Sequence, residues 1–133
     1  MMSPDEVKKF IKEIFVTLIE EREVSEATCA RYFSKEYIQY VDGKVLDYDH
    51  FVKHMKTLMA TIKSAKVTFK HIIVEGDKVA TVHNVKAIKN DGSHIEAQVN
   101  ALMQIKNNKI ILCDELTHLI QGEKSDKDLG SRH

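Results

Sequence analysis

The feature that most constrains this chain is a change in hydrophobic period near Lys66. Before this point, apolar residues recur every three or four positions, which is typical of amphipathic helices. After it, apolar and polar residues alternate, which is typical of strands with one buried face. A chain with helices first and strands afterwards is expected to pack its helices on one face of a sheet, which is an α+β fold.

The composition fits one soluble domain. The chain has 133 residues, of which 43% are hydrophobic and 30% are charged. Twenty basic residues balance twenty acidic ones, so no net field draws the protein to nucleic acid or to an anionic membrane. Acidic and basic residues follow within a few positions of the N-terminus, where a signal peptide would have an apolar core. No apolar run is long enough to span a membrane.

The two cysteines, Cys29 and Cys113, lie far apart in the chain and outside any CxxC spacing. This pattern argues against a disulfide framework and against a zinc site. We therefore expect reduced thiols in a cytoplasmic protein.

Three helices are expected before the change of period. Ser3, Pro4 and Glu6 form a capping box that starts the first helix. Ser25 caps a shorter second helix over residues 26–33, and Asp47 caps a third over residues 48–63. The buried stripe of the first helix contains Val7, Phe10, Ile11, Ile14, Phe15, Leu18 and Ile19.

His54 falls on the buried stripe of the third helix, since it comes three residues after Phe51 and four before Leu58. Its spacing from His50 would allow both imidazoles to bind one metal ion, but no third ligand accompanies them, so we expect no metal. His54 is instead predicted to form a hydrogen bond at a pocket wall, with a satisfied core histidine as the alternative.

Five strands and a tail follow from the remaining patterns. A short strand is predicted over residues 37–41 and ends at the Asp42-Gly43 turn. Three further turn signals, Gly76-Asp77, Asp91-Gly92 and Asn107-Asn108, divide four long strands of an antiparallel meander. We expect a domain over residues 1–121 and a charged tail over 122–133.

If every turn has two central residues, the registers are fixed and one face of the meander becomes mostly apolar. On this face His71, Val82, Ala101 and Asp114 form one cross-strand row, which places an acid and an imidazole on an apolar floor. A β-bulge would exchange the two faces beyond it. The opposite face carries a second polar row of Lys70, His83, Asn100 and Glu115, which we expect to meet water or another subunit.

Asp114 and His71 are therefore the predicted catalytic pair, because an apolar pocket raises the pKa of an acid and a nearby imidazolium lowers it. The alternative is a buried Asp that is hydrogen-bonded for structural reasons alone. The predicted ligand-binding residues are Phe15, Tyr40, His54, Val82, Asn84, Ala101, Leu116 and His118.

Four segments give the chain a resemblance to a known superfamily: RYFSKEYIQYVDGK at 31–44, DHFVKHMKTL at 49–58, IIVEGDKVATVH at 72–83 and IKNNKIILCDEL at 105–116. Their order resembles the nuclear transport factor two-like superfamily, in particular its SnoaL-like and ketosteroid isomerase-like branch. The resemblance implies a cone-shaped half-barrel with a deep pocket, and a homodimer through the outer face of the sheet.

This superfamily contains isomerases, cyclases and dehydratases, and also binding proteins without catalysis, so the fold does not choose the function. In ketosteroid isomerase-like members the base lies on the short strand, near the position of Tyr40 and Asp42 in this chain. The oxyanion-stabilising acid of these members lies where this chain has Ala101, so this chain departs from their pattern. SnoaL-like cyclases use a carboxylate low in the pocket, a role that Asp114 would take here.

The resulting hypothesis is a pocket for a small, mostly apolar molecule that carries an oxygen function. It would act without metal or organic cofactor, by proton abstraction next to a carbonyl. The alternative is a module that binds a ligand or a protein partner without catalysis. A third possibility is a pocket filled by the chain's own side chains.

Overall fold

The computed structural model describes residues 2–122, and its helices begin where the sequence predicts. Ser3 and Glu6 form the expected capping box, with N···O distances of 2.9 and 3.2 Å. The Ser25 and Asp47 side chains likewise accept hydrogen bonds from the first turns of their helices. The three helices are α1 (Pro4–Phe15), α2 (Glu26–Tyr32) and α3 (Tyr48–Ala60).

The end of the first helix differs from the expected continuous α-helix. After Phe15 the chain continues as a π-helical turn, η1 (Val16–Glu20), which ends with a hydrogen bond from the Glu21 amide to the Val16 carbonyl at 2.8 Å. This wider winding still places Leu18 in the core, where it is 3% exposed.

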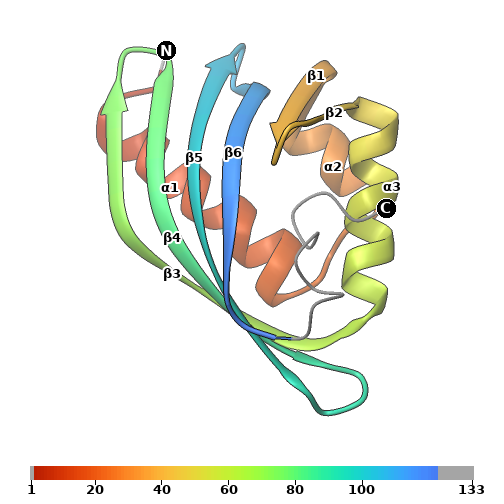
Figure 1. Cartoon of the computed structure of the whole chain (residues 1–133). Coiled ribbons are helices and arrows are strands. Elements are labelled where there is room, and N and C mark those ends of the chain that lie inside the picture. Colours follow the sequence, from red (N-terminus) through yellow and green to blue (C-terminus); the bar gives the residue numbers. More distant parts are fainter. Residues whose placement is uncertain (1, 123–133) are drawn as a thin grey trace.

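Six strands form one open sheet in the order β2-β1-β6-β5-β4-β3 (Figure 1). All neighbouring strands are antiparallel except β1 and β6, which run parallel, so the sheet is mixed rather than purely antiparallel. The strand expected at 37–41 begins earlier, directly after α2, and β2 was not predicted. The strands are β1 (Phe33–Val41), β2 (Lys44–Asp47), β3 (Ile62–Glu75), β4 (Lys78–Lys89), β5 (His94–Lys106) and β6 (Lys109–Gln121).

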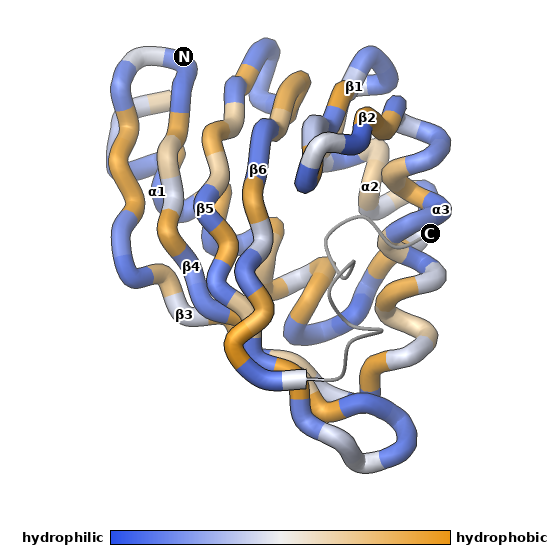
Figure 2. Tube along the Cα trace, viewed as in Figure 1, coloured by the Kyte–Doolittle hydropathy of each residue, from blue (hydrophilic) through white to orange (hydrophobic). Residues whose placement is uncertain are grey.

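The long strands curve, and α1 and α3 lie on the concave side of the sheet, with α1 behind it in the view of Figure 1. Figure 2 shows apolar and polar residues alternating along the strands. The concave side holds one apolar core between helices and sheet. The α+β, cone-shaped half-barrel predicted from the sequence is therefore confirmed.

The turn between β4 and β5 has three central residues rather than the expected two. The Lys89 amide donates to the Ser93 carbonyl at 2.8 Å, which leaves residues 90–92 as the connection. Gly92 has a φ of +87°, the left-handed conformation that glycine adopts at this position of a three-residue hairpin. The extra residue shifts the pairing of β4 with β5 by one position.

The other two turns have the expected two residues, but one of the strands that each turn joins carries a bulge. One register shift lies between Phe69 and His71 in β3, and another lies on β6 opposite Gln104 and Ile105. A bulge adds one residue to one strand and so turns the following side chains to the other face.

These three shifts correct the predicted faces. β5 keeps the predicted face toward the core, whereas β4 and most of β6 present the opposite one. Thr81, His83 and Val85 lie inside instead of Val82 and Asn84, and Glu115 lies inside instead of Asp114. The row of His71 and Val82 exists, but on the outer face of the sheet.

Both cysteines are free thiols and are buried. Within residues 2–122, no helix has the length and apolar character needed to cross a membrane. The predicted tail at 122–133 lies outside the described residues, apart from Gly122.

Candidate functional site

A cavity of about 130 Å³ lies between the concave face of the sheet and helices α1 and α3. This volume is far above the roughly 10–15 Å³ that one water molecule needs, so the chain's own side chains do not fill the pocket. Most of the wall is apolar. The polar side chains on it are Tyr37, Gln39, His54, His83, Cys113, Glu115 and Thr117.

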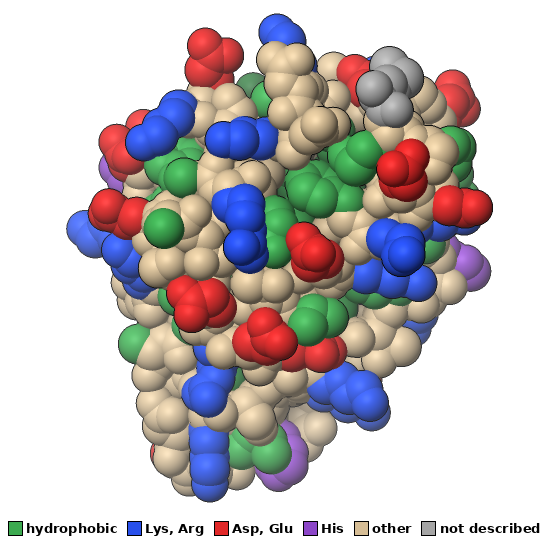
Figure 3. Space-filling view, turned by 180° about the vertical axis from the view of Figure 1, so that it is seen from behind, with side chains coloured by type: hydrophobic (Ala, Val, Ile, Leu, Met, Phe, Trp, Pro, Cys, Tyr) green, Lys and Arg blue, Asp and Glu red, His purple; other side chains and the backbone are tan. Residues whose placement is uncertain are grey.

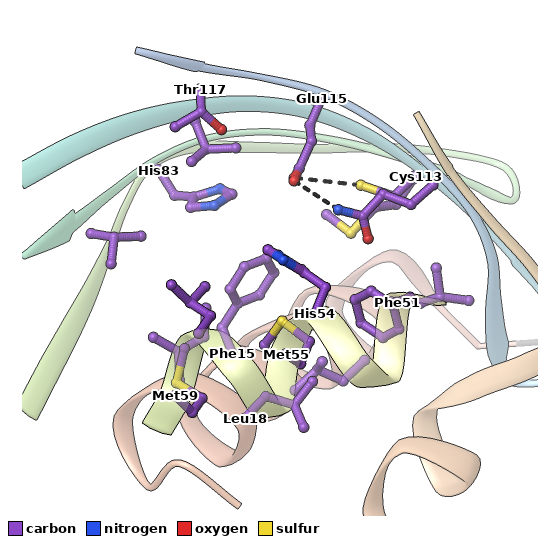
Figure 4. A pocket seen from close by; sticks show the side chains of 18 of the residues that line it. Phe15, Leu18, Phe51, His54, Met55, Met59, His83, Cys113, Glu115 and Thr117 are labelled. Atoms are coloured by element: carbon purple, nitrogen blue, oxygen red, sulfur yellow. Dashed lines mark hydrogen bonds between the residues drawn. The ribbon is translucent and has the colours of Figure 1, made fainter. Parts of the chain in front are cut away.

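Glu115 is the carboxylic acid of this wall. The residue as a whole is half-buried, but its carboxylate points into the cavity from β6 (Figure 4). Gln39 on β1 donates from Nε2 to Oε1 of Glu115 at 3.1 Å, and the Cys113 thiol donates to Oε2 at 3.7 Å. Two neighbouring side chains therefore hold the carboxylate in place.

A third side chain fixes the amide that holds Glu115. The Tyr37 hydroxyl donates to Oε1 of Gln39 at 2.8 Å, and both residues are almost fully buried. The Gln39 oxygen thus accepts from the phenol while its nitrogen donates to the acid. Tyr37, Gln39 and Glu115 form a hydrogen-bonded chain in which each polar group has a partner.

Burial raises the pKa of Glu115 to about 7. The charges of Asp42 and Asp114 contribute to this rise in pKa, while the hydrogen bonds from Cys113 and Gln39 oppose it. An acid with this pKa is present in both protonation states near neutral pH, which suits a group that gives and takes protons.

His83 on β4 is another titratable group turned toward the cavity from the sheet (Figure 4). It is 2% exposed, and burial lowers its pKa to about 4, so the imidazole is neutral at pH 7. Its Nδ1 shares a hydrogen bond of 2.9 Å with the Thr81 hydroxyl. The Phe15 ring contacts it edge-on, with 4.7 Å between ring centroids.

His54 reaches the same cavity from the helical side, and its imidazole points toward the sheet below Glu115 (Figure 4). Beside them, Oδ1 of Asp42 accepts from the Thr117 amide at 2.7 Å, so that the β1–β2 turn is attached to β6. Within residues 2–122, no cluster of three or more His, Cys, Asp or Glu side chains is arranged to hold a metal ion.

The structure brings only some of the predicted site residues together. Phe15 and His54 line the cavity, and Ala101 lies buried on the concave face without belonging to the wall. The predicted pair of Asp114 and His71 is exposed, which removes the geometric reason for its catalytic role. The predicted binding residues outside the cavity are Tyr40, Val82, Asn84, Leu116 and His118.

The second polar row of the sequence is also divided. His83 and Glu115 lie inside, whereas Lys70 and Asn100 lie on the outer face, where Lys70 donates to Gln98 at 2.8 Å. The signal for this exchange was present in the sequence, because Asn90-Asp91-Gly92 also suits a three-residue hairpin with glycine last. The bulges on β3 and β6 have no comparable signal.

An open, curved sheet with helices over an apolar pocket and one buried acid defines the class of small cone-shaped proteins to which this chain belongs. The sequence comparison gives the family: residues 6–112 match the SnoaL-like domain, and the chain belongs to this family. An uncharacterized protein of Schizosaccharomyces pombe is 35% identical over 100 residues, which cover 75% of this chain and 77% of the relative.

Solved structures share the fold at low sequence identity. AclR from Streptomyces galilaeus, provisionally named a hydroxylase, superposes with a TM-score of 0.76 at 15% identity over 98% of this chain and 89% of AclR. An LEH-like epoxide hydrolase of M. tuberculosis gives 0.70 at 12% identity over 86% and 84%. IdmH from Streptomyces antibioticus, provisionally named a polyketide cyclase, gives 0.70 at 12% over 83% and 90%. Likeness at this identity establishes the fold alone.

Proposed function

We propose that this protein binds a small, mostly apolar molecule in the cavity and that Glu115 transfers a proton to or from it. The observation that carries the proposal is a carboxylate held by two hydrogen-bond donors in an apolar cavity, with a pKa near 7. Isomerisation, cyclisation and dehydration are the reaction classes that such a proton carrier serves.

In this reaction the Glu115 carboxylate takes a proton from a carbon next to a carbonyl and later returns it. This chain's own residues support such a step, because the wall around the acid is mostly apolar and Gln39 keeps the acid oriented. AclR, IdmH and the epoxide hydrolase carry names of enzymes, which agrees with chemistry in a pocket of this fold. Those activities are named for these other proteins and not for this chain.

The second proposal concerns the outer face of the sheet, which we expect to pair with a second copy of the chain. Cross-strand pairing puts Ile73, Leu102, Asp114 and Tyr40 in one row there, and the three apolar or aromatic members are 65%, 41% and 45% exposed. Leu116 is 67% exposed on the same face. Apolar patches of this kind mark interaction surfaces, and Leu116→Lys is expected to convert a dimer into a monomer in sedimentation analysis.

The helical side differs from this face. Figure 3 shows the surface behind the view of Figure 1, where acidic, basic and apolar side chains are interspersed. The mixed charges agree with the equal numbers of basic and acidic residues. A small molecule and a second copy therefore remain the proposed partners, and the two buried thiols suit a reducing compartment such as the cytoplasm.

The alternative function is binding without chemistry. It predicts that a ligand occupies the cavity while no proton of that ligand exchanges. It is favoured by the full hydrogen bonding of Glu115, because an acid satisfied by Gln39 and Cys113 also serves as a structural group.

Deuterium exchange separates these alternatives. Ketones of one and two rings are incubated with the protein in D2O, and deuterium at the carbons next to the carbonyl is measured by mass spectrometry. We expect catalysed exchange that falls by a factor of about 100 or more in Glu115→Gln. Asp114→Asn keeps the exchange, with its pH profile moved toward acid because one of the charges that raise the pKa of Glu115 is gone. Exchange that survives Glu115→Gln would overturn the assignment, and bound ketone without exchange would favour the binding module.

A further inference from the structure

The cavity wall carries a second functional group besides the acid, because His83 lines the cavity as Glu115 does. Thr81, the hydrogen-bond partner of His83, lies in the same cross-strand row as Glu115. Thr81 pairs with Ala101, and Ala101 pairs with Glu115. Neighbouring strands lie about 4.8 Å apart, so the backbones of the outer two residues are about 10 Å apart. Ala101, between them, does not reach the cavity wall, whereas Glu115 and His83 both line the cavity.

His83 leans toward this row. Its Nδ1 lies 2.9 Å from the hydroxyl of Thr81, two residues earlier on the same strand. The rings of Phe15 and Phe69 contact the imidazole at centroid distances of 4.7 and 5.5 Å, so its orientation is fixed on several sides.

The bond to Thr81 also selects the tautomer. A hydroxyl carries one proton, which needs an acceptor when it is buried. Among the side-chain hydrogen bonds of the described residues, Thr81 makes this one, so its proton is satisfied when the hydroxyl donates to Nδ1 of His83. The imidazole proton then resides on Nε2, which makes a neutral hydrogen-bond donor.

The volume of the cavity limits what this donor meets. An apolar protein cavity of about 150 Å³ holds one benzene molecule, and the present cavity measures about 130 Å³. Bulky side chains set this limit from the helical side, namely Phe15, Phe51, Met55, Leu58 and Met59. The space suits one ring and not a row of fused rings.

We propose that the site takes a carbonyl compound of about one ring, with its oxygen at Nε2 of His83 and the neighbouring carbon at the Glu115 carboxylate. This deepens the proposed function and rests on it. Glu115 removes the proton, the electron pair of the C–H bond becomes the carbon–carbon double bond, and the carbonyl pair moves to the oxygen. The His83 N–H stabilises that oxygen, and the proton on Glu115 returns to carbon.

The size of the ligand is tested with two matched ketones, cyclohexanone and 1-tetralone, which has a second ring. If the cavity admits both, the added apolar area makes 1-tetralone bind more tightly. We expect the reverse, with cyclohexanone bound at least tenfold more tightly by calorimetry. Met59→Ala enlarges the cavity and should restore 1-tetralone binding. Equal or tighter binding of 1-tetralone to the unmodified protein, or no binding of cyclohexanone, would overturn the size assignment.

The role of His83 is tested with cyclohexanone labelled with ¹³C at the carbonyl. A hydrogen bond to the oxygen moves this resonance downfield, and we expect the shift to disappear in His83→Phe and to remain in Glu115→Gln. Thr81→Val provides a milder variant with a reduced shift, and His118→Ala is the control for an exposed histidine. A shift that persists in His83→Phe refutes the role.

The two failures are distinguishable. If 1-tetralone exchanges deuterium faster than cyclohexanone and Glu115→Gln abolishes both, the size assignment fails while the proton-transfer function stands. If cyclohexanone shows the carbonyl shift but no exchange occurs with any ketone, the proposed function fails while the recognition by His83 stands.

Discussion

Asp114 and Glu115 are consecutive acids, yet the two faces of the sheet give them different surroundings. Asp114 is exposed on the outer face, whereas the Glu115 carboxylate points into the cavity and has hydrogen-bond partners there. The histidines divide in the same way, with His71 outside and His83 inside. Residue type alone therefore does not define the site, because burial and neighbours decide whether an acid or an imidazole can do chemistry.

The largest contrast between the two faces should appear in the free energy of unfolding, when one side chain on each face of β6 is shortened. Ile110→Ala removes a side chain that is 1% exposed at the cavity wall, and should lower the free energy of unfolding by about 2–5 kcal/mol. Ile120→Ala, at a site that is 50% exposed, should change it by less than about 0.5 kcal/mol. Chemical denaturation measures both. A loss in Ile120→Ala as large as in Ile110→Ala would contradict the expected contrast.

The second contrast is in the pH dependence of stability. The pKa of Glu115 is raised to about 7 in the folded protein, so its contribution to stability is fully present below the ordinary value of 4.5 and is lost as the pH rises through 7. Glu115→Gln removes the cost of the buried charge, and should stabilise the protein above pH 7 by up to about 3 kcal/mol.

His83 has the opposite sign. Its pKa is lowered to about 4, so the stability it contributes is present above 6.5 and is lost as the pH falls toward 4. The two groups offset each other in the unmodified protein, and Glu115→Gln should unmask a rise in stability between pH 4 and 6.5. Asp114→Asn is the control, with a change within about 0.5 kcal/mol. A flat pH profile in Glu115→Gln would contradict the assignment of both groups.

The smallest expected effect comes from removing the charge of Asp42, which lies in the turn between β1 and β2. Asp42→Asn keeps an oxygen for the Thr117 amide but removes one of the negative charges that raise the pKa of Glu115. The pKa of Glu115 should therefore fall, and the pH profile of ketone exchange should move toward acid. Stability should drop by about 1 kcal/mol because a charge-assisted bond becomes neutral. An unchanged profile would show that the charge of Asp42 is screened from the site.

Much of the fold could be predicted because its signals are local. The capping residues Ser3, Ser25 and Asp47 act within one turn, and the Gly76-Asp77 and Asn107-Asn108 turns act within four residues. The site depends on longer-range features. His54 was found because its helix has one buried stripe, but Asp114 was chosen in place of Glu115 because a single bulge on β6 reverses the face.

The sequence by itself determined the order of helices and strands, the apolar character of the pocket and the presence of acids and histidines on β4 and β6. Only the tertiary structure decided which of them face the cavity. The physical reason is the period of two along a strand: a shift of one residue costs little locally, yet it moves every side chain to the other face. A bulge also bends the strand that carries it, so the register shifts and the curvature that encloses the cavity are both features of the assembled sheet.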